Sequence, residues 1–427
     1  MIVRDTLHFI VAMSLILFTN VHVLDVRHGR LQENHHVLVE GDTIREVSDR
    51  PLTSASARVI NGGGRTLMPG LIDCHVHTTF SQTNLGLLAQ TPNTTLALRA
   101  LPILRGMLRR GFTTVRDAGG ADYALKAALE DGMSGTVLGP RLFVSGPALS
   151  PTGGHGDFRP RSDRLQPVGC GCQRLASTRV VDGVDAVRLA VRELLQMGAD
   201  QIKIMSSGGV ASPTDPVNAL GYSVEETRAI VDEAAARQTY VLAHAYTPEA
   251  IRRAVECGVR TIEHGNLIDA PTAKLMAEHD AYAVPTLITY EALARDGVRL
   301  GLGAESVAKI EQVRAAGLHS LEIFRAAGVK LAFGTDLLGA SHNLQSEEFL
   351  IRAQVQTPAE VLRSATLIGA EVLGRSGRLG EVTPGAMADL LLVDGNPLQD
   401  LTCLAGQGEQ IALVMQGGHI RVGSLAA

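Results

Sequence analysis

Tryptophan is absent from this 427-residue chain, and aromatic residues make up only 4% of it. Hydrophobic residues nevertheless reach 45%, so the apolar material is mainly aliphatic. A composition of this kind supplies enough material for a large core and favours buried parallel strands covered by helices. We therefore expect a globular α/β protein.

Cysteine is scarce as well. The five residues are scattered along the chain and odd in number: Cys74, Cys170, Cys172, Cys257 and Cys403. This pattern excludes a disulfide framework and fits a reducing compartment. Cys170 and Cys172 stand in the segment VGCGC, where two loop thiols are the favoured interpretation. A metal-binding pair is the alternative, but no second pair follows at zinc-finger spacing.

Neither sign of charge dominates the chain, because the formal net charge is only -5 and no long run of like charges occurs. Nothing here attracts nucleic acid or an anionic membrane, and no P-loop motif is present. We expect a small-molecule or dipeptide substrate, no nucleic acid and no membrane partner. The low charge also permits assembly into a homo-oligomer.

The apolar run Phe9–Phe18 near the N-terminus is too short to span a bilayer. It could be the core of a signal peptide within residues 1–20, since Arg4 precedes it. No convincing small-residue cleavage site follows, and LILFTNVHVLD has the pattern of a strand. We therefore expect a cytoplasmic protein, with Met13 as an alternative start of the chain.

Both ends of the chain are predicted to be rich in short strands separated by turn residues. These strands are expected at Leu15–Leu24, His36–Glu40, Thr43–Val47, Ala57–Ile60, Gly380–Val382, Asp389–Val393, Ile411–Met415 and His419–Val422. The fold class that we expect is α/β, with a small β-sandwich-like domain built from both chain ends (residues 14–66 plus 372–427).

The middle of the chain, residues 67–371, alternates between short apolar runs and helical patterns. Helices are predicted at Thr95–Arg110, Val184–Met197, Ser223–Arg237, Pro248–Cys257, Pro271–His279, Glu305–Ala316 and Pro358–Ala365. Strands are predicted at Thr113–Arg116, Arg141–Ser145, Gln201–Met205, Tyr240–His244, Thr261–His264, Tyr282–Thr286 and Leu331–Thr335, after a first strand that starts at Leu67. Eight such units indicate a (β/α)8 TIM barrel.

The first of these strands leads into the segment DCHVH. Residues two apart in a strand point to the same side, so His75 and His77 could reach one metal ion. Neutral imidazole is the commonest protein ligand for zinc-like cations. A pair of loop histidines without a metal is the alternative for this motif taken alone.

Four later predicted strands also end in or near residues that can bind a metal ion or take part in catalysis, namely Lys203, His244, His264 and Asp336. In a barrel the carboxyl ends of all strands meet on one face, so these residues would join the histidine pair. Lys203 is unusual there, because an ammonium group repels metal; an ion pair with Asp336 is its alternative role.

The order His-x-His, Lys, His, His, Asp resembles the binuclear-metal branch of the amidohydrolase superfamily. FTTVRDAGG, SPTGGHGD, DQIKIMSSGGVASPTD, LAHAYTPEAI, RTIEHGNLID and FGTDLLG are similar to its imidazolonepropionase-like and Xaa-Pro dipeptidase-like metallo-carboxypeptidase subgroup. The resemblance implies two divalent metal ions, most simply zinc. It also implies their ligands: His75, His77 and Asp336 for one ion, His244 and His264 for the other, and Lys203, carboxylated by CO2, as a bridge.

The resemblance further implies hydrolysis of the amide bond to a C-terminal residue of dipeptides or N-acyl amino acids. Asp336 would carry the proton from the attacking hydroxide to the leaving nitrogen. His155 and Tyr246 would contact the substrate, while Arg116 and Asp117 are either support for the ligands or a structural ion pair. Alternatives are a cyclic-amide hydrolase, an ochratoxin-type amidase and a non-catalytic barrel scaffold.

Overall fold

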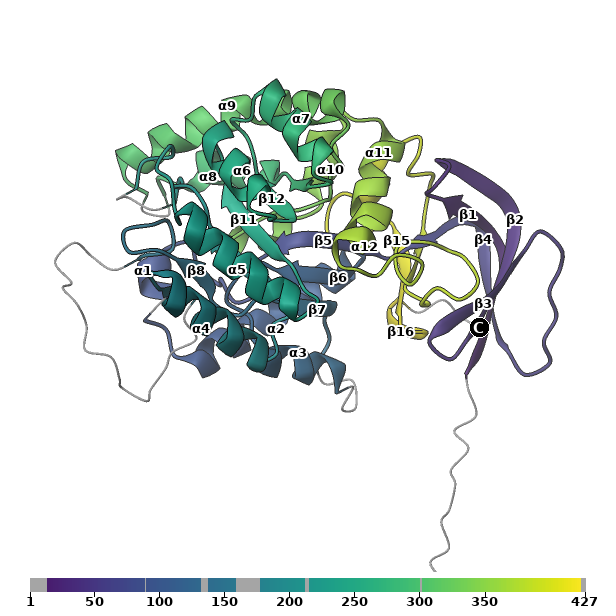
Figure 1. Cartoon of the computed structure of the whole chain (residues 1–427). Helices are drawn as coiled ribbons and strands as arrows, with labels where there is room; N and C mark the ends of the chain where they lie inside the picture. Colours follow the sequence, from purple (N-terminus) through teal and green to yellow (C-terminus); the bar gives the residue numbers. More distant parts are fainter. Residues whose placement is uncertain are drawn as a thin grey trace, which may run out of the picture.

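The computed structural model describes residues 14–88, 90–131, 137–158, 177–211, 215–299 and 302–423 (Figure 1). Cys170 and Cys172 lie outside these ranges, as do the first 13 residues. Within the described ranges, no helix combines the length and the apolar character that crossing a bilayer requires.

The two ends of the chain share one mixed seven-stranded sheet in the order β16-β15-β14-β4-β1-β2-β3. Its strands are β1 (Leu15–Asp25), β2 (Arg30–Glu40), β3 (Thr43–Ser48), β4 (Arg58–Pro69), β14 (Leu390–Val393), β15 (Ile411–Gln416) and β16 (His419–Val422). The N-terminal and C-terminal strands meet where β4 pairs antiparallel with β14 and parallel with β1.

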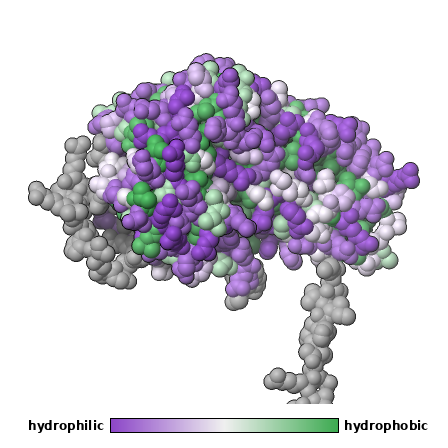
Figure 2. Space-filling model, viewed as in Figure 1, coloured by the Kyte–Doolittle hydropathy of each residue, from purple (hydrophilic) through white to green (hydrophobic). Residues whose placement is uncertain are grey.

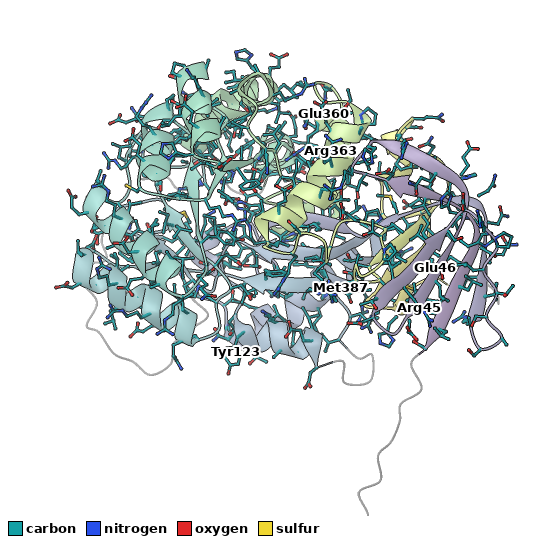
Figure 3. The ribbon with its side chains drawn as sticks, turned by 45° about the vertical axis from the view of Figure 1, so that its right-hand side comes forward. Arg45, Glu46, Tyr123, Glu360, Arg363 and Met387 are labelled. Atoms are coloured by element: carbon teal, nitrogen blue, oxygen red, sulfur yellow. The ribbon has the colours of Figure 1, made fainter. Side chains whose placement is uncertain are left out.

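This seven-stranded sheet has its own core of buried side chains, among them Phe18, Val39 and Leu413. At the β3 edge, Thr43 forms an isolated bridge with Met387, and the amide of Ile44 donates to the carbonyl of Ala386. Figure 3 shows Met387 beside β3. The expected strand Gly380–Val382 is not formed; Gly380 has a φ of +81°, which turns the chain.

The middle of the chain forms two parallel sheets that face the helices. The six-stranded sheet has the order β13-β12-β11-β10-β8-β9, and the three-stranded sheet has the order β5-β6-β7. Their strands are β5 (Leu71–Val76), β6 (Phe112–Asp117), β7 (Arg141–Val144), β8 (Ala148–Ser150), β9 (Thr178–Val180), β10 (Ile202–Met205), β11 (Val241–Ala245), β12 (Thr261–His264) and β13 (Tyr282–Val284).

The expected eighth strand, Leu331–Thr335, is not a regular strand, so the described strands form two sheets and no closed ring. Leu331 makes only an isolated parallel bridge to Ala283 of β13. The amide of Phe333 donates to the carbonyl of Ser364 instead of continuing a ladder, while the carbonyl of Phe333 accepts the amide of Cys74 in β5. Residues 331–336 therefore connect β13 with β5 without extending either sheet.

Helices follow most of the parallel strands and cover them on the outside. They are α1 (Leu85–Leu88), α2 (Asn93–Arg109), α3 (Tyr123–Glu130), α4 (Val184–Gln196), α5 (Val224–Ala236), α6 (Pro248–Glu256), α7 (Ala270–Glu278), α8 (Leu287–Asp296), α9 (Ala304–Ala327), α10 (Glu347–Arg352), α11 (Pro358–Arg363) and α12 (Gly369–Val372). Helix α9 is longer than predicted because it continues to Gly328, whose left-handed backbone caps it.

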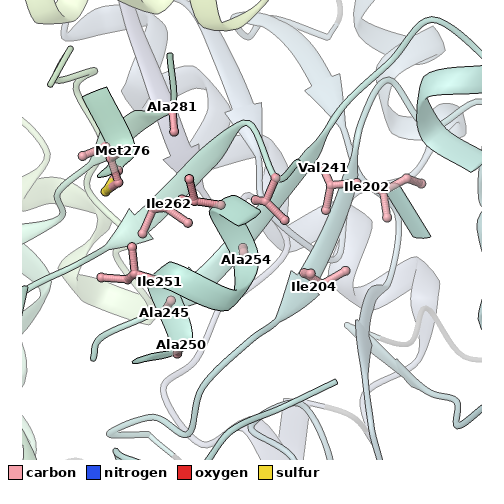
Figure 4. Packing of buried hydrophobic residues seen from close by; sticks show 14 of the residues in the cluster. Ile202, Ile204, Val241, Ala245, Ala250, Ile251, Ala254, Ile262, Met276 and Ala281 are labelled. Carbon is pink, nitrogen blue, oxygen red and sulfur yellow. The ribbon is translucent and has the colours of Figure 1, made fainter. Parts of the chain in front are cut away.

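The main core lies between these helices and the six-stranded sheet (Figure 4). Ile202 and Ile204 of β10, with Ile262 of β12, pack in the same cluster as Ile251 and Ala254 of α6. Side chains alternate along a strand, so Lys203 points to the opposite side of β10, away from the helices. The face in Figure 2 is mainly hydrophilic, with hydrophobic residues in small separate patches.

Candidate functional site

Strand β5 ends in the predicted histidine pair. His75 is its next-to-last residue, and His77 follows directly after it. Both are buried, with 1% and 8% of their surface exposed. The side chain of Asp73 holds this end of β5 in place, because it accepts the amide of His75 at 3.1 Å and the hydroxyl of Thr335 at 2.7 Å.

Asp336 lies against the two histidines. Its Oδ1 is 3.1 Å from Nε2 of His77 and 3.4 Å from Nε2 of His75. One ligand atom from each of these three residues lies within 4.8 Å of the others, as in a metal site. Asp336 has a φ of +53° and His264 a φ of +75°; for residues other than glycine, such strained backbone occurs preferentially at functional sites.

The histidines are oriented by hydrogen bonds through one ring nitrogen, which leaves the other available. Nδ1 of His75 bonds to Glu263 at 2.6 Å, and Nδ1 of His77 donates to the carbonyl of Gly119 at 2.9 Å. Nε2 of His75 is buried and has no hydrogen-bond partner among the described residues. Outer partners of this kind fix the tautomer of histidines that bind metals, so the donor set fits a cation.

His244 and His264 complete the group of histidines. Their rings lie 4.7 Å apart, and the ring of His264 is 5.0 Å from that of His75. Nε2 of His244 donates to the carbonyl of Gly208, and Nδ1 of His264 bonds to Thr286. Burial lowers the pKa of both rings well below its usual value, which favours the neutral form that binds metals.

Lys203 is 1% exposed and lies among these residues. Burial lowers its pKa to about 8, against the opposing effect of Glu263 and Asp336. In the described part of the chain no carboxylate is within 4 Å of its amine, so the alternative ion pair with Asp336 is not formed. The lowered pKa favours the neutral amine, which is the form that reacts with CO2.

All eight predicted site residues line a single cavity of about 70 Å³: His75, His77, His155, Lys203, His244, Tyr246, His264 and Asp336. The ring of His155 stacks on that of His244 at 4.5 Å, and its Nδ1 lies 3.2 Å from Asp215. The hydroxyl of Tyr246 shares a 2.9 Å hydrogen bond with that of Tyr290. The remaining wall is largely apolar and includes Phe80, Val210, Leu293 and Leu338.

Arg116 pairs with Glu263, a residue that the sequence analysis missed, and not with Asp117. Its Nη2 lies 2.9 Å from one oxygen of Glu263, and both side chains are fully buried. The other oxygen of Glu263 holds His75, so this ion pair supports the candidate ligand directly. Asp117 instead accepts the amide and the hydroxyl of Thr78. The missed signal was an acidic residue inside an apolar strand.

Gly209 leaves room for His155. A Cβ atom at this position would lie 2.1–2.4 Å from three atoms of the imidazole ring. We therefore expect Gly209→Ala to displace His155 and to lower kcat/KM about tenfold or more, because a misplaced positioning group slows catalysis. The overpacking should separately lower the free energy of unfolding by about 1–3 kcal/mol. Steady-state kinetics check the loss of activity. Gly303→Ala, where a Cβ meets nothing within 4 Å, is the control, and equal kinetics of the two variants would contradict the role of Gly209.

Comparisons with known proteins identify the family of this chain. The model of the Amidohydrolase family matches residues 66–420. Ochratoxinase of Aspergillus niger is 32% identical over 366 residues, which cover 83% of this chain and 75% of the relative. A solved amidohydrolase structure is 60% identical with a TM-score of 0.94, covering 97% of this chain and all of that one.

A second solved structure is described as a prolidase complexed with N-methylphosphonate-L-proline. It is 56% identical with a TM-score of 0.93, and the match covers 95% of this chain and 99% of that one. The family match spans most of the chain, and its named relatives are hydrolases. The chain therefore belongs to the amidohydrolase family and is a hydrolase of C–N bonds.

Proposed function

We propose that this protein is a binuclear metal-dependent amidohydrolase that cleaves the amide bond to a C-terminal residue of dipeptides or N-acyl amino acids. The observation that carries the proposal is the meeting of His75, His77 and Asp336, with Lys203, His244 and His264 on the same cavity. The likeness to a prolidase whose structure holds N-methylphosphonate-L-proline supports this substrate class, since that ligand carries an L-proline residue.

The donor set suits two divalent ions, with zinc the best match to neutral imidazole and carboxylate ligands. His75, His77 and Asp336 would hold one ion, and His244 and His264 the other. Carboxylated Lys203 would supply an anion between them. When bound, such ions acidify water and polarise an amide carbonyl.

The chain's own residues perform the proton transfer and the positioning. Burial would raise the pKa of Asp336, but the neighbouring His75 and His77 hold it well below its usual value, so the side chain is a carboxylate. In the proposed reaction this carboxylate accepts a proton from the attacking water. It then returns this proton to the leaving nitrogen. Asp215 and Tyr290 orient His155 and Tyr246 beside the cavity, where these two side chains can donate hydrogen bonds to the substrate carbonyl or carboxylate.

Three larger features belong to the same proposal. The two parallel sheets would be arcs of one (β/α)8 barrel over residues 67–371, which residues 331–336 complete with an irregular strand. Residues 14–66 and 372–427 would form a second domain. The protein would act as a homo-oligomer. Sedimentation of the purified protein tests this, because it gives the molecular mass of the assembly.

The function is tested by screening Xaa-Xaa dipeptides and N-acyl amino acids with the zinc-loaded protein. We expect turnover of several members of this class, with release of the C-terminal residue. Turnover of cyclic amides, with no release of a C-terminal residue from any dipeptide or N-acyl amino acid, would overturn the proposal in favour of a cyclic-amide hydrolase. Ochratoxin-type amides belong in the same screen, and failure of every compound would favour a non-catalytic scaffold.

Lys203→Ala tests the bridging anion. We expect the purified, zinc-loaded variant to hold about one ion fewer than the wild type by elemental analysis, because a shared ligand is lost. Its turnover should be abolished and should return in part with added short-chain carboxylates, which can replace the missing anion. Near-normal activity without added carboxylates would contradict the bridging role.

A further inference from the structure

A second cavity, of about 480 Å³, lies at the opposite ends of the parallel strands from the candidate site. Gln201, Tyr240 and Arg260 line it, and each directly precedes a strand, namely β10, β11 and β12. None of the eight candidate site residues contributes to its wall. It is therefore separate from the hydrolytic site.

Three arginines give this cavity a positive charge: Arg237, Arg260 and Arg375. Across the described ranges, no carboxylate lies within 4 Å of any of these three guanidinium groups. The single carboxylate in the wall is that of Asp200, and it is already engaged by the amine of Lys126 at 2.7 Å and the amide of Val144 at 2.8 Å. The cavity thus has unbalanced positive charge.

Aromatic rings hold two of these arginines. The guanidinium carbon of Arg260 is 4.9 Å from the ring centre of Tyr240, and that of Arg375 is 5.6 Å from the ring centre of Phe143. Arg260 uses one nitrogen to donate to the carbonyl of Glu371 at 2.8 Å. A cation–π contact restrains a guanidinium and leaves its remaining N–H groups free to bind the oxygens of an anion.

We propose that this cavity binds a small dianionic oxyanion, and specifically a phosphate group. Three arginines exceed what one carboxylate can use, whereas a tetrahedral phosphate offers several oxygens and about two negative charges. The volume of the cavity also leaves space for an organic group attached to the phosphate. Free phosphate and a phosphate monoester share this chemistry, and inorganic phosphate is the simplest probe of it.

Calorimetric titration of the zinc-loaded, full-length protein with inorganic phosphate at fixed ionic strength tests the proposal. We expect saturable binding that weakens about tenfold or more in Arg237→Gln and in Arg375→Gln, since each loses a charge-assisted hydrogen bond. Arg99→Gln, which changes an exposed arginine outside the cavity, should bind as the wild type does. Absence of saturation, or equal weakening in all three variants, would overturn the proposal.

Phosphate could also bind at the metal centre, and a fourth variant separates the two sites. Lys203→Ala is altered only in the hydrolytic site and should keep the cavity-dependent binding. Loss of binding in Lys203→Ala with full binding in the two cavity variants would place phosphate at the metals and refute the cavity site. A phosphate monoester that binds more tightly than free phosphate would identify the organic group as part of the ligand.

Discussion

Replacing Asp336 with asparagine lowers kcat by about 10²- to 10⁴-fold, the range that general acid–base catalysis supplies. The amide cannot accept the proton of the attacking water and therefore cannot return it to the leaving nitrogen. The side chain keeps its size, so the contacts of its neighbours His75 and His77 change little. Steady-state kinetics on the best dipeptide, together with metal analysis, measure the effect.

The metal analysis separates two reasons for a loss of rate in this variant. A slow Asp336→Asn protein that keeps its metal identifies proton transfer as the lost step, whereas loss of metal identifies a ligand role. Asp232→Asn is the matched control, because Asp232 is 65% exposed and makes only a 3.4 Å ion pair with Arg188. A fully metal-loaded Asp336→Asn protein with wild-type kcat would refute the assigned role.

Replacing Arg116 with methionine is expected to lower the free energy of unfolding by about 3–5 kcal/mol. The change leaves the carboxylate of Glu263 buried and without its cation. It also removes a donor to the carbonyl of Cys74, the residue just before His75. Because Glu263 orients His75, we expect metal affinity to fall about 10- to 100-fold as well. Urea unfolding and titration with a competing chelator measure the two effects.

A double variant distinguishes charge burial from ligand support. In Arg116→Met/Glu263→Gln no unpaired charge remains, so at least half of the lost unfolding free energy should return. Metal affinity should stay low, because a neutral amide holds the imidazole of His75 less firmly than a carboxylate does. Full recovery of both quantities would show that Glu263 contributes nothing to the site beyond its charge balance with Arg116.

Much of the architecture could be predicted because apolar periodicity reports which face of an element is buried. Helices α2, α4, α5 and α6 and most of the parallel strands lie within a few residues of the predicted ranges. Leu331–Thr335 has the composition of a strand, yet tertiary hydrogen bonds to Ser364 and to β5 decide its conformation. Helix α8 was missed: it lies between the predicted strand Tyr282–Thr286 and the predicted helix Glu305–Ala316, where no element was predicted.

Five of the six candidate ligands could be found from the sequence because each stands in a short strand or directly after one, and Asp336 because it ends an apolar run that forms no regular strand. The partners of His155 and Tyr246 could not be found, since Asp215 and Tyr290 have no recognisable spacing from these two side chains. Glu263 did carry a signal, as an acidic residue in the apolar strand β12. Only the folded structure shows that it meets Arg116 and His75, which belong to the other parallel sheet.

The joining of the chain ends in one sheet has a consequence for biosynthesis. Strand β4 receives its second partner only when β14 has been made, since Leu67 pairs with Leu392. At roughly 5–20 residues per second, ribosomes expose β4 tens of seconds before β14 exists. During that interval the buried side chains Leu67 and Met68 lack part of their cover, and an unpaired strand edge invites association with other chains. Slow C-terminal synthesis should therefore favour aggregation of the nascent protein.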